Sequence, residues 1–410
     1  MFKKALFLFL LCSSLLFSQN KNSDLKVYLD CDRCDNTFIK QNLNNVEFVR
    51  DQNYADVHLF FTTQRNGSGG TAYEIEFIGQ NEFEKFQDIL SFSTDTDMTN
   101  DDIRQRILKY IKLGLIRFWI KQGKTDNISI TVSSPKKSDE EAKEEKDPWN
   151  YWVFRIGANG YFSGQESSKF SNVNFNLSAK RVTDKNKFSI RLGLSENKST
   201  FSFGEEEIVS IQSSKYLNTS DIISITEHWS VGAFARLGSS VFRNKDFYWS
   251  FKPAIEYNFF KYSESSKKQL TLSYRNGIVY NNYIERSVFG KESEYLWEHG
   301  LALGGSVNQK WGSISGQASY QQFLHDTSLN SLSFFIGTNV RLFKGFSMNL
   351  NGSYSITRNQ IDLPAGDVSL EELLLQQQQL KSGYNYFVSI GFSYSFGSIY
   401  NTIVNPRFNF

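Results

Sequence analysis

From Trp149 onward the chain alternates apolar and polar residues in runs of roughly ten or more, separated by short polar stretches. Alternation with a period of two is typical of β-strands that present two different faces. We therefore predict about twelve strands by this criterion, near residues 149–163, 169–182, 187–203, 206–225, 229–243, 246–262, 268–285, 291–309, 312–325, 328–343, 346–360 and 384–397.

This pattern predicts a transmembrane antiparallel β-barrel, because each strand of such a barrel faces hydrocarbon with every second residue and the lumen with the others. The even strand number agrees with bacterial barrels. The predicted lipid-facing residues include Trp152, Phe154, Ile156 and Ala158 in the first strand, Phe247, Trp249, Phe251, Ile255, Tyr257 and Phe259 in the sixth, and Leu332, Phe334, Ile336, Val340 and Leu342 in the tenth.

The lengths of the connections predict an orientation, because outer-membrane barrels keep short turns on the periplasmic side and longer loops outside. Connections after even-numbered strands are short, at 183–186, 226–228, 310–312 and 344–345. Those after odd-numbered strands include 196–207, 286–291 and 361–383. Both ends of the barrel are therefore expected in the periplasm.

The first part of the chain is organised differently. Residues 1–18 carry Lys3 and Lys4 before a short apolar run and are interpreted as a secretory signal peptide. Residues 19–133 are expected to form a small periplasmic α/β domain, and the charged stretch 134–148 a solvated linker. The barrel then spans 149–397, and 398–410 form a C-terminal tail that either plugs the lumen or lies outside it.

Within the α/β domain we expect strands and helices in alternation. A Gly-rich turn at 66–70 joins two strands as a hairpin, and Thr99 with Asp102 forms a capping box at the start of the longer helix. The apolar stripe of that helix is Ile103, Ile107, Ile111, Leu115 and Phe118. The expected strands are 25–29, 46–50, 57–64, 73–78 and 127–132, with a short helix at 37–43.

Composition agrees with this picture. The 410 residues include 37 Phe and 20 Tyr, an excess that fits aromatic girdles at two membrane interfaces. The net charge of +2 and the lack of a basic run argue against nucleic-acid binding.

The residues opposite the apolar positions are candidates for lining the lumen, and most of them are basic. A basic constriction favours anions, whereas the competing interpretation is that these side chains fill a narrow barrel through hydrogen bonds and ion pairs. The candidates are Arg155, Lys180, Arg191, Arg236, Lys252, Glu256, Arg275, Glu298 and Arg341.

No residue pattern indicates catalysis, a cofactor or a metal. Cys31 and Cys34 have C-x-x-C spacing, for which a structural disulfide is favoured over a zinc or redox site because no second ligand pair exists. Among the histidines, only His325 is placed near an outer loop where a hydrolase would need it, and a solvated loop histidine is the favoured interpretation.

Two segments resemble known families. Residues 389–396, with Gly391 followed by the alternating aromatic residues Tyr394 and Phe396, are similar to the signal by which barrels are handed to the barrel-assembly machinery. The stretch from Tyr28-Leu29-Asp30-Cys31 through Gly67-Ser68-Gly69-Gly70 to Phe77-Ile78-Gly79-Gln80, continued by Asp147-Pro148-Trp149-Asn150-Tyr151-Trp152, resembles an uncharacterised family of Bacteroidetes-like outer-membrane barrels with a periplasmic front domain. The resemblance implies architecture and location, and no activity.

The sequence thus predicts a barrel in the cell outer membrane, in contact with membrane lipid, that acts as a channel or transporter for small polar solutes, with anions as one hypothesis. Two alternatives stay open. One is an outer-membrane enzyme acting on lipid or surface peptide. The other is a structural or assembly barrel whose residues 24–133 bind a periplasmic partner or gate the lumen.

Overall fold

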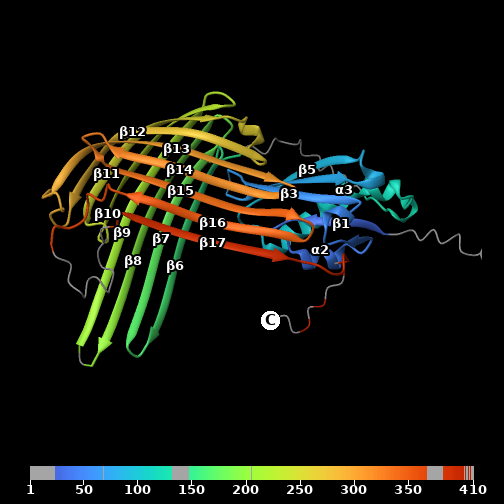
Figure 1. Ribbon diagram of the computed structural model, residues 1–410, viewed down its shortest axis with the longest axis horizontal. Helices are drawn as coiled ribbons and strands as arrows, with labels where there is room; N and C mark the ends of the chain where they lie inside the picture. Colours follow the sequence, from blue (N-terminus) through green and yellow to red (C-terminus); the bar gives the residue numbers. More distant parts are fainter. Residues whose placement is uncertain are drawn as a thin grey trace, which may run out of the picture.

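The computed structural model describes residues 24–67, 69–131, 147–204, 206–366, 382–400, 402, 405 and 407. These residues form two β-sheets (Figure 1): a small one in the front domain, residues 24–131, and a large antiparallel one that follows it. The protein is therefore mainly β, as the sequence predicts.

The front domain is an α/β unit with a five-stranded sheet in the order β2-β1-β3-β4-β5. Strand β1 pairs in parallel with β2 and β3, whereas β3, β4 and β5 are antiparallel. The elements are β1 (Leu25–Asp30), α2 (Asn36–Asn42), β2 (Val46–Phe48), β3 (Val57–Arg65), β4 (Thr71–Gly79), β5 (Gln87–Thr94) and α3 (Asn100–Lys121), with short 3-10 helices at Gln52–Tyr54, Asn81–Phe83 and Thr125–Asn127.

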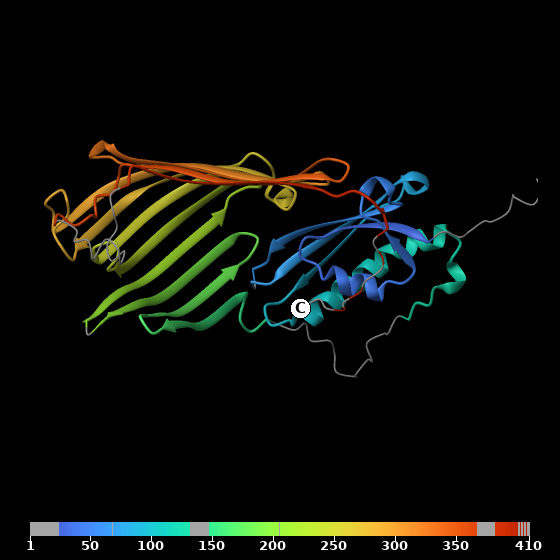
Figure 2. The same ribbon diagram turned by 60° about the horizontal axis from the view of Figure 1, so that its bottom comes forward.

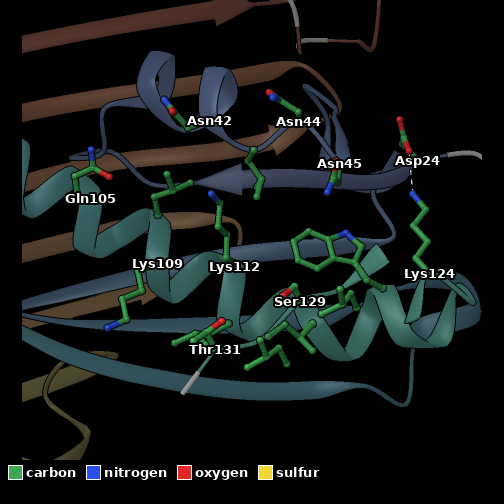
Figure 3. A pocket seen from close by; sticks show the side chains of 17 residues that line it. Asp24, Asn42, Asn44, Asn45, Gln105, Lys109, Lys112, Lys124, Ser129 and Thr131 are labelled. Atoms are coloured by element: carbon green, nitrogen blue, oxygen red, sulfur yellow. Dashed lines mark hydrogen bonds and ion pairs between the residues drawn. The ribbon is translucent and has the colours of Figure 1, made fainter. Parts of the chain in front are cut away.

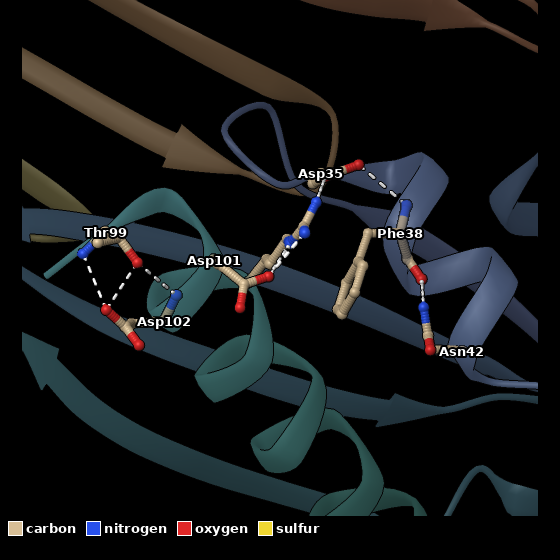
Figure 4. Close-up of polar contacts among 7 residues, drawn as sticks. Asp35, Phe38, Asn42, Thr99, Asp101 and Asp102 are labelled. Atoms are coloured by element: carbon tan, nitrogen blue, oxygen red, sulfur yellow. Dashed lines mark hydrogen bonds and ion pairs between the residues drawn. The ribbon is translucent and has the colours of Figure 1, made fainter. Parts of the chain in front are cut away.

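Side-chain caps fix the first turns of both helices (Figure 4). The predicted capping box of α3 forms: the Asp102 backbone N–H donates to Thr99 Oγ1 at 3.2 Å, and the Thr99 N–H donates to Asp102 Oδ2 at 3.0 Å. Asp35 caps α2 by accepting from the Phe38 N–H at 2.9 Å. Arg104 bonds both Asp101 and Asp35, and so ties the two helix starts together.

The front-domain core lies between α3 and the sheet. The predicted stripe of α3 faces this core, with Ile107, Ile111, Leu115 and Phe118 buried and Ile103 packed at its margin. Gly114 lies on the same face, where a Cβ atom would come within 2.1 Å of the Phe77 ring. The helix therefore approaches the sheet at a point where only glycine fits.

Two elements of the front domain differ from the prediction. The expected strand at 127–132 does not form in its described part: residues 125–127 make a 3-10 turn, and 128–131 pair with no strand. Strand β5 fills the edge position beside β4 instead, with Leu90 opposite Ile75. Within its sequence, QDILSFST, only the four residues Leu90–Ser93 alternate apolar and polar, so the local signal for this strand is short.

The large sheet contains the twelve predicted strands, each within a few residues of its expected position. They are β6 (Trp152–Gln165), β7 (Ser168–Val182), β8 (Asn186–Phe203), β9 (Glu206–Ser224), β10 (Trp229–Ser240), β11 (Lys245–Asn258), β12 (Lys268–Tyr283), β13 (Ser293–Gln309), β14 (Gly312–Phe323), β15 (Asp326–Phe343), β16 (Phe346–Thr357) and β17 (Tyr384–Tyr394). Each strand pairs antiparallel with its neighbours in sequence.

This sheet is curved and open (Figure 2). Its two edge strands, β6 and β17, pair with β7 and β16 respectively and not with each other. The expected closed barrel is therefore not what the structure contains. Alternation specifies the two faces of each strand, but it carries no information on whether the first and last strands meet.

The two faces of the sheet differ as predicted from the alternation. One, the apolar face, leaves large hydrophobic side chains exposed, among them Phe154, Ile156, Phe251, Ile255, Phe334 and Ile336. The other, the polar face, carries the predicted lumen-lining residues. An exposed apolar surface of this extent requires a hydrophobic environment or a partner.

The sheet has two ends. At the front-domain end the connections are 183–185, 225–228, 259–267, 310–311 and 344–345; at the far end they are 166–167, 204–205, 241–244, 284–292, 324–325 and 358–383. The predicted long loop at 196–207 is wrong, because β8 and β9 continue through it, with Thr200 opposite Val209. A polar sequence of this kind can form a strand where that strand extends past the apolar part of a sheet.

Candidate functional site

Five of the predicted lumen-lining residues meet in one cavity on the polar face. The cavity has a volume of about 360 Å³, and residues from β7 to β14 line it, so the sheet curves around it. Its basic residues are Lys180, Arg191, Arg236, Lys252 and Arg275.

Ladder pairing brings these cations together. Lys180 on β7 lies opposite Ser189 on β8, and Ser189 in turn lies opposite Ser220 on β9. Arg236 on β10 lies between Asn218 and Ser250 on the neighbouring strands. Residues directly opposite on antiparallel strands share one face, so these rows place guanidinium, ammonium, hydroxyl and amide groups side by side.

One of the five cations is neutralised. Lys252 forms an ion pair with Glu298, with Nζ and Oε1 2.8 Å apart. Arg236 donates through Nε to Asn218 Oδ1 at 2.9 Å, and the Arg275 guanidinium stacks 4.3 Å from the centroid of the Phe234 ring. Within the described part of the chain, the other four cations form no ion pair, so the cavity carries an excess of positive charge.

Such a cavity can bind an anion that also offers hydrogen-bonding groups. Arginine binds carboxylate and phosphate oxygens through a fork of N–H donors, and serine and asparagine add donors and acceptors beside it. Neighbouring cations of this density repel one another, and a bound anion relieves that repulsion.

The remaining predicted residues lie elsewhere on the polar face. Arg155 on β6 is opposite Ser178 and outside the cavity. Glu256 accepts a hydrogen bond from the Tyr262 hydroxyl at 2.8 Å. Burial, together with the acceptor Glu256, raises the pKa of Tyr262 to about 12, so this hydroxyl stays protonated as a donor.

Arg341 is on the predicted face but binds the front domain. Its guanidinium donates through Nη1 and Nη2 to the two carboxylate oxygens of Asp30, at 2.6 Å each. Asp30 also lies 3.0 Å from Nε2 of His58, which is fully buried. Arg341 therefore lies on the expected face, but its guanidinium is engaged by Asp30 of the front domain. A partner 311 residues away in sequence leaves no local signal.

Burial, Arg341 and His58 together determine the pKa of Asp30. Burial by itself raises the pKa of Asp30, but the hydrogen bonds and charges of Arg341 and His58 outweigh burial and leave the pKa below its ordinary value. Nearby, burial raises the pKa of Tyr28 to about 12, and the Arg341 guanidinium lies 5.4 Å from its ring centroid. The carboxylate is thus held in its charged form against the guanidinium.

The C-terminal tail lies against the front domain. The Arg50 backbone N–H donates to the Ile399 carbonyl at 2.8 Å, the Phe48 N–H donates to Thr402 Oγ1 at 2.9 Å, and Val49 pairs with Tyr400. The described tail residues therefore extend the open edge of β2 and do not fill the polar-face cavity. Of the expected assembly-signal residues, Gly391 and Tyr394 lie in β17, and Phe396 follows it with its side chain exposed.

The far end of the sheet is partly covered by its own loops. Leu296, Phe323 and Ile361 are buried together, which brings the β16–β17 connection onto the polar face. Lys245 forms an ion pair with Asp362 at 3.4 Å, with both side chains mostly buried. These contacts narrow the approach to the polar face from the far end.

A second cavity, of about 960 Å³, lies on the front domain between the loop after α2 and α3 (Figure 3). Lys109 and Lys112 of α3, together with Asn42, Asn44 and Asn45, form its polar rim. Lys124 at one end bonds Asp24 at 2.9 Å. The walls include the buried residues Leu43, Leu108 and Trp119, so the cavity combines an apolar floor with a basic rim.

Among the described residues, Cys31, Cys34, His325 and His299 each contact a partner within the fold. Cys31 and Cys34 are joined by a disulfide. His325 packs against Phe323, while its neighbour Asp326 accepts hydrogen bonds from Ser328. His299 lies on the apolar face, between Tyr274 and Gln322. Within the described ranges, no three His, Cys, Asp or Glu side chains are grouped so as to hold a metal ion.

Comparison with known protein families finds no family model that matches the chain, and comparison with curated proteins finds no match. In the described residues, the helices are all too short or too polar to cross a membrane. The functional argument therefore depends on the site itself.

Proposed function

We propose that this protein is an outer-membrane channel or transporter for small anionic solutes. The large sheet closes into a barrel when β6 pairs with β17, the apolar face contacts lipid, and the polar face becomes the lumen. The front domain then lies in the periplasm, and Gly391, Tyr394 and Phe396 belong to the segment that the barrel-assembly machinery recognises.

The observation that carries this proposal is the cavity on the polar face with its four unpaired cations. Rings of arginine or lysine select anions in pores, because they offset the energy an anion loses on leaving bulk water. The apolar face supports the membrane location, since a charged residue on the lipid side costs roughly 2–4 kcal/mol at the midplane and the apolar side chains avoid this cost.

Reversal potentials in a planar bilayer test the proposal. Purified protein between two KCl concentrations should pass chloride in preference to potassium. Arg191→Gln combined with Arg275→Gln should lower that preference, because it removes two unpaired cations from the cavity. Arg243→Gln is the matched control, since Arg243 lies in the far-end connection 241–244 and not in the cavity.

Two results would count against the proposal. Cation preference in the wild-type protein would contradict an anion-selective lumen. A protein that inserts stably but never conducts, under any condition and in any variant, would favour a structural or assembly role for the sheet.

A further inference from the structure

The front domain contacts the end of the large sheet at points spread across most of its width. Near one edge, a Cβ atom on Gly67 would lie 2.8 Å from Val182 Cβ at the end of β7. In the middle, Lys267 bonds Glu74 and Glu76 at 3.1 and 3.4 Å.

The contacts continue to the other edge. Asp30 of the front domain pairs with Arg341 of β15. Next to this pair, Lys344 in the β15–β16 turn donates through its ammonium group to the Tyr54 hydroxyl of the front domain. After β17, the Arg50 guanidinium donates to the Phe396 carbonyl at 2.9 Å and to the Gly397 carbonyl at 3.4 Å. The front domain thus reaches from β7 to the segment that follows the last strand.

These contacts place the front domain against the end of the polar face (Figure 2). A cavity of about 310 Å³ lies between them, lined on one side by Asp30–Arg33 and Phe60–Thr63 of the front domain. Its other wall is the polar face itself, through Asn308, Ser313 and Asn339.

The interface between the front domain and the large sheet is polar, although each of them has its own cluster of buried hydrophobic side chains. Of the two hydrophobic clusters in the described residues, one contains only front-domain side chains and the other only residues of the sheet and its loops. The front domain is therefore held to the sheet by ion pairs and hydrogen bonds. Polar interfaces between domains of one chain resemble transient interfaces, and relative motion of the two domains is their default expectation.

We infer that the front domain has a second function as a lid: docked as in this structure, it closes the front-domain end of the polar face, and undocked it admits solute to the basic cavity. The inference rests on the proposed channel. The Asp30–Arg341 pair, the carboxylates that bond Lys267 and the bonds from Phe48 and Arg50 to the tail hold the lid in its docked position.

A reversible covalent lock tests the lid. Gly67→Cys combined with Val182→Cys should form a disulfide, because the two β-carbons need to separate by only about 1 Å to reach the usual distance. Gln64→Cys with Ser265→Cys, bridged by a reducible bis-maleimide crosslinker, is a second lock, since the Gln64 amide nitrogen donates to Ser265 Oγ at 3.2 Å across the interface. Gly67→Cys alone is the control for reduction of the native disulfide.

Two readouts separate the lid from the channel. The first is bilayer current, which should fall at least tenfold in the oxidised lock and return on reduction, and rise in Arg341→Gln. The second needs no current: a bulky maleimide should label Asn339→Cys, under the lid, at least tenfold faster in the reduced lock than in the oxidised lock. Ser163→Cys at the far end of β6 should label equally in both states.

The outcomes are distinct. Labelling that follows the lock without any current supports the lid and overturns the proposed channel. Current that passes unchanged through the oxidised lock overturns the lid and leaves the channel. Equal labelling of Asn339→Cys in both states, or failure of both cysteine pairs to form, also overturns the lid.

Discussion

Replacing Asp30 by asparagine should release the front domain from the sheet. The substitution keeps the shape of the side chain but removes the charge that Arg341 contacts at two oxygens, 2.6 Å each. Asp30 is 8 % exposed, whereas the Arg341 side chain is about one-third exposed and can recover part of its hydration. Breaking a buried pair costs about 3–5 kcal/mol, and this partial rehydration favours the lower end, about 3 kcal/mol.

A loss of about 3 kcal/mol corresponds to a docking equilibrium roughly a hundredfold weaker. Hydrogen exchange of backbone N–H groups measures this docking equilibrium at single residues. The N–H groups of Phe48 and Arg50 bond the tail, whereas that of Val49, between them, bonds Val27 inside the front domain at 2.9 Å. In Asp30→Asn, exchange at Phe48 and Arg50 should accelerate up to a hundredfold, because undocking separates the front domain from the tail, while exchange at Val49 is unchanged.

The same site predicts a response to acid. The pKa of Asp30 is lowered in the docked state, so its contribution to docking is complete above the ordinary carboxyl pKa of about 3.9 and is lost as the pH falls through the lowered value. Wild-type docking should weaken below about pH 4, and Asp30→Asn should lack this step. Unchanged exchange at Phe48 and Arg50 in the variant would refute this role of Asp30, and faster exchange at Val49 would show unfolding instead.

Three further predictions concern separate features. Glu298→Gln should increase the preference for chloride in reversal-potential measurements, because it frees Lys252 from its ion pair, and a decrease would contradict the charge argument. Gly114→Ala should lower the stability of the front domain by about 1–3 kcal/mol through contact with Phe77, with partial rescue by Phe77→Leu in thermal unfolding, whereas a stabilised Gly114→Ala would disprove the close packing. Asp362→Asn should loosen the β16–β17 connection at residues 359–366 by leaving Lys245 without its carboxylate, seen as faster proteolysis of that connection, and wild-type proteolysis rates would exclude the role.

The strands of the large sheet were predictable because their signal is local. Each strand repeats polar and apolar residues with a period of two, and ladder pairing follows from chain order, so Lys180 and Arg191 could be assigned to one face. The grouping of these cations into one cavity depends on curvature across eight strands. That curvature has no counterpart in the sequence pattern of any single strand.

The docking of the front domain could not be predicted for a related reason. Arg341 fits the alternation of β15 as well as any lining residue, and only its distant partner Asp30 gives it a different role. The β5 strand was missed and a strand at 127–132 wrongly expected, because short alternating segments near a domain end satisfy the same pattern. Whether β6 pairs with β17 likewise could not be predicted, because these two strands are far apart in the chain.

The hydrogen bond between Phe48 and Thr402 connects residues 354 positions apart. Bringing such distant points together in a loose chain costs about 5 kcal/mol of loop entropy, far more than one bond returns. The tail can therefore attach only after the twelve strands have shortened the path between its ends. Until then the unpaired backbone groups of the β2 edge are open to pairing with any other extended chain.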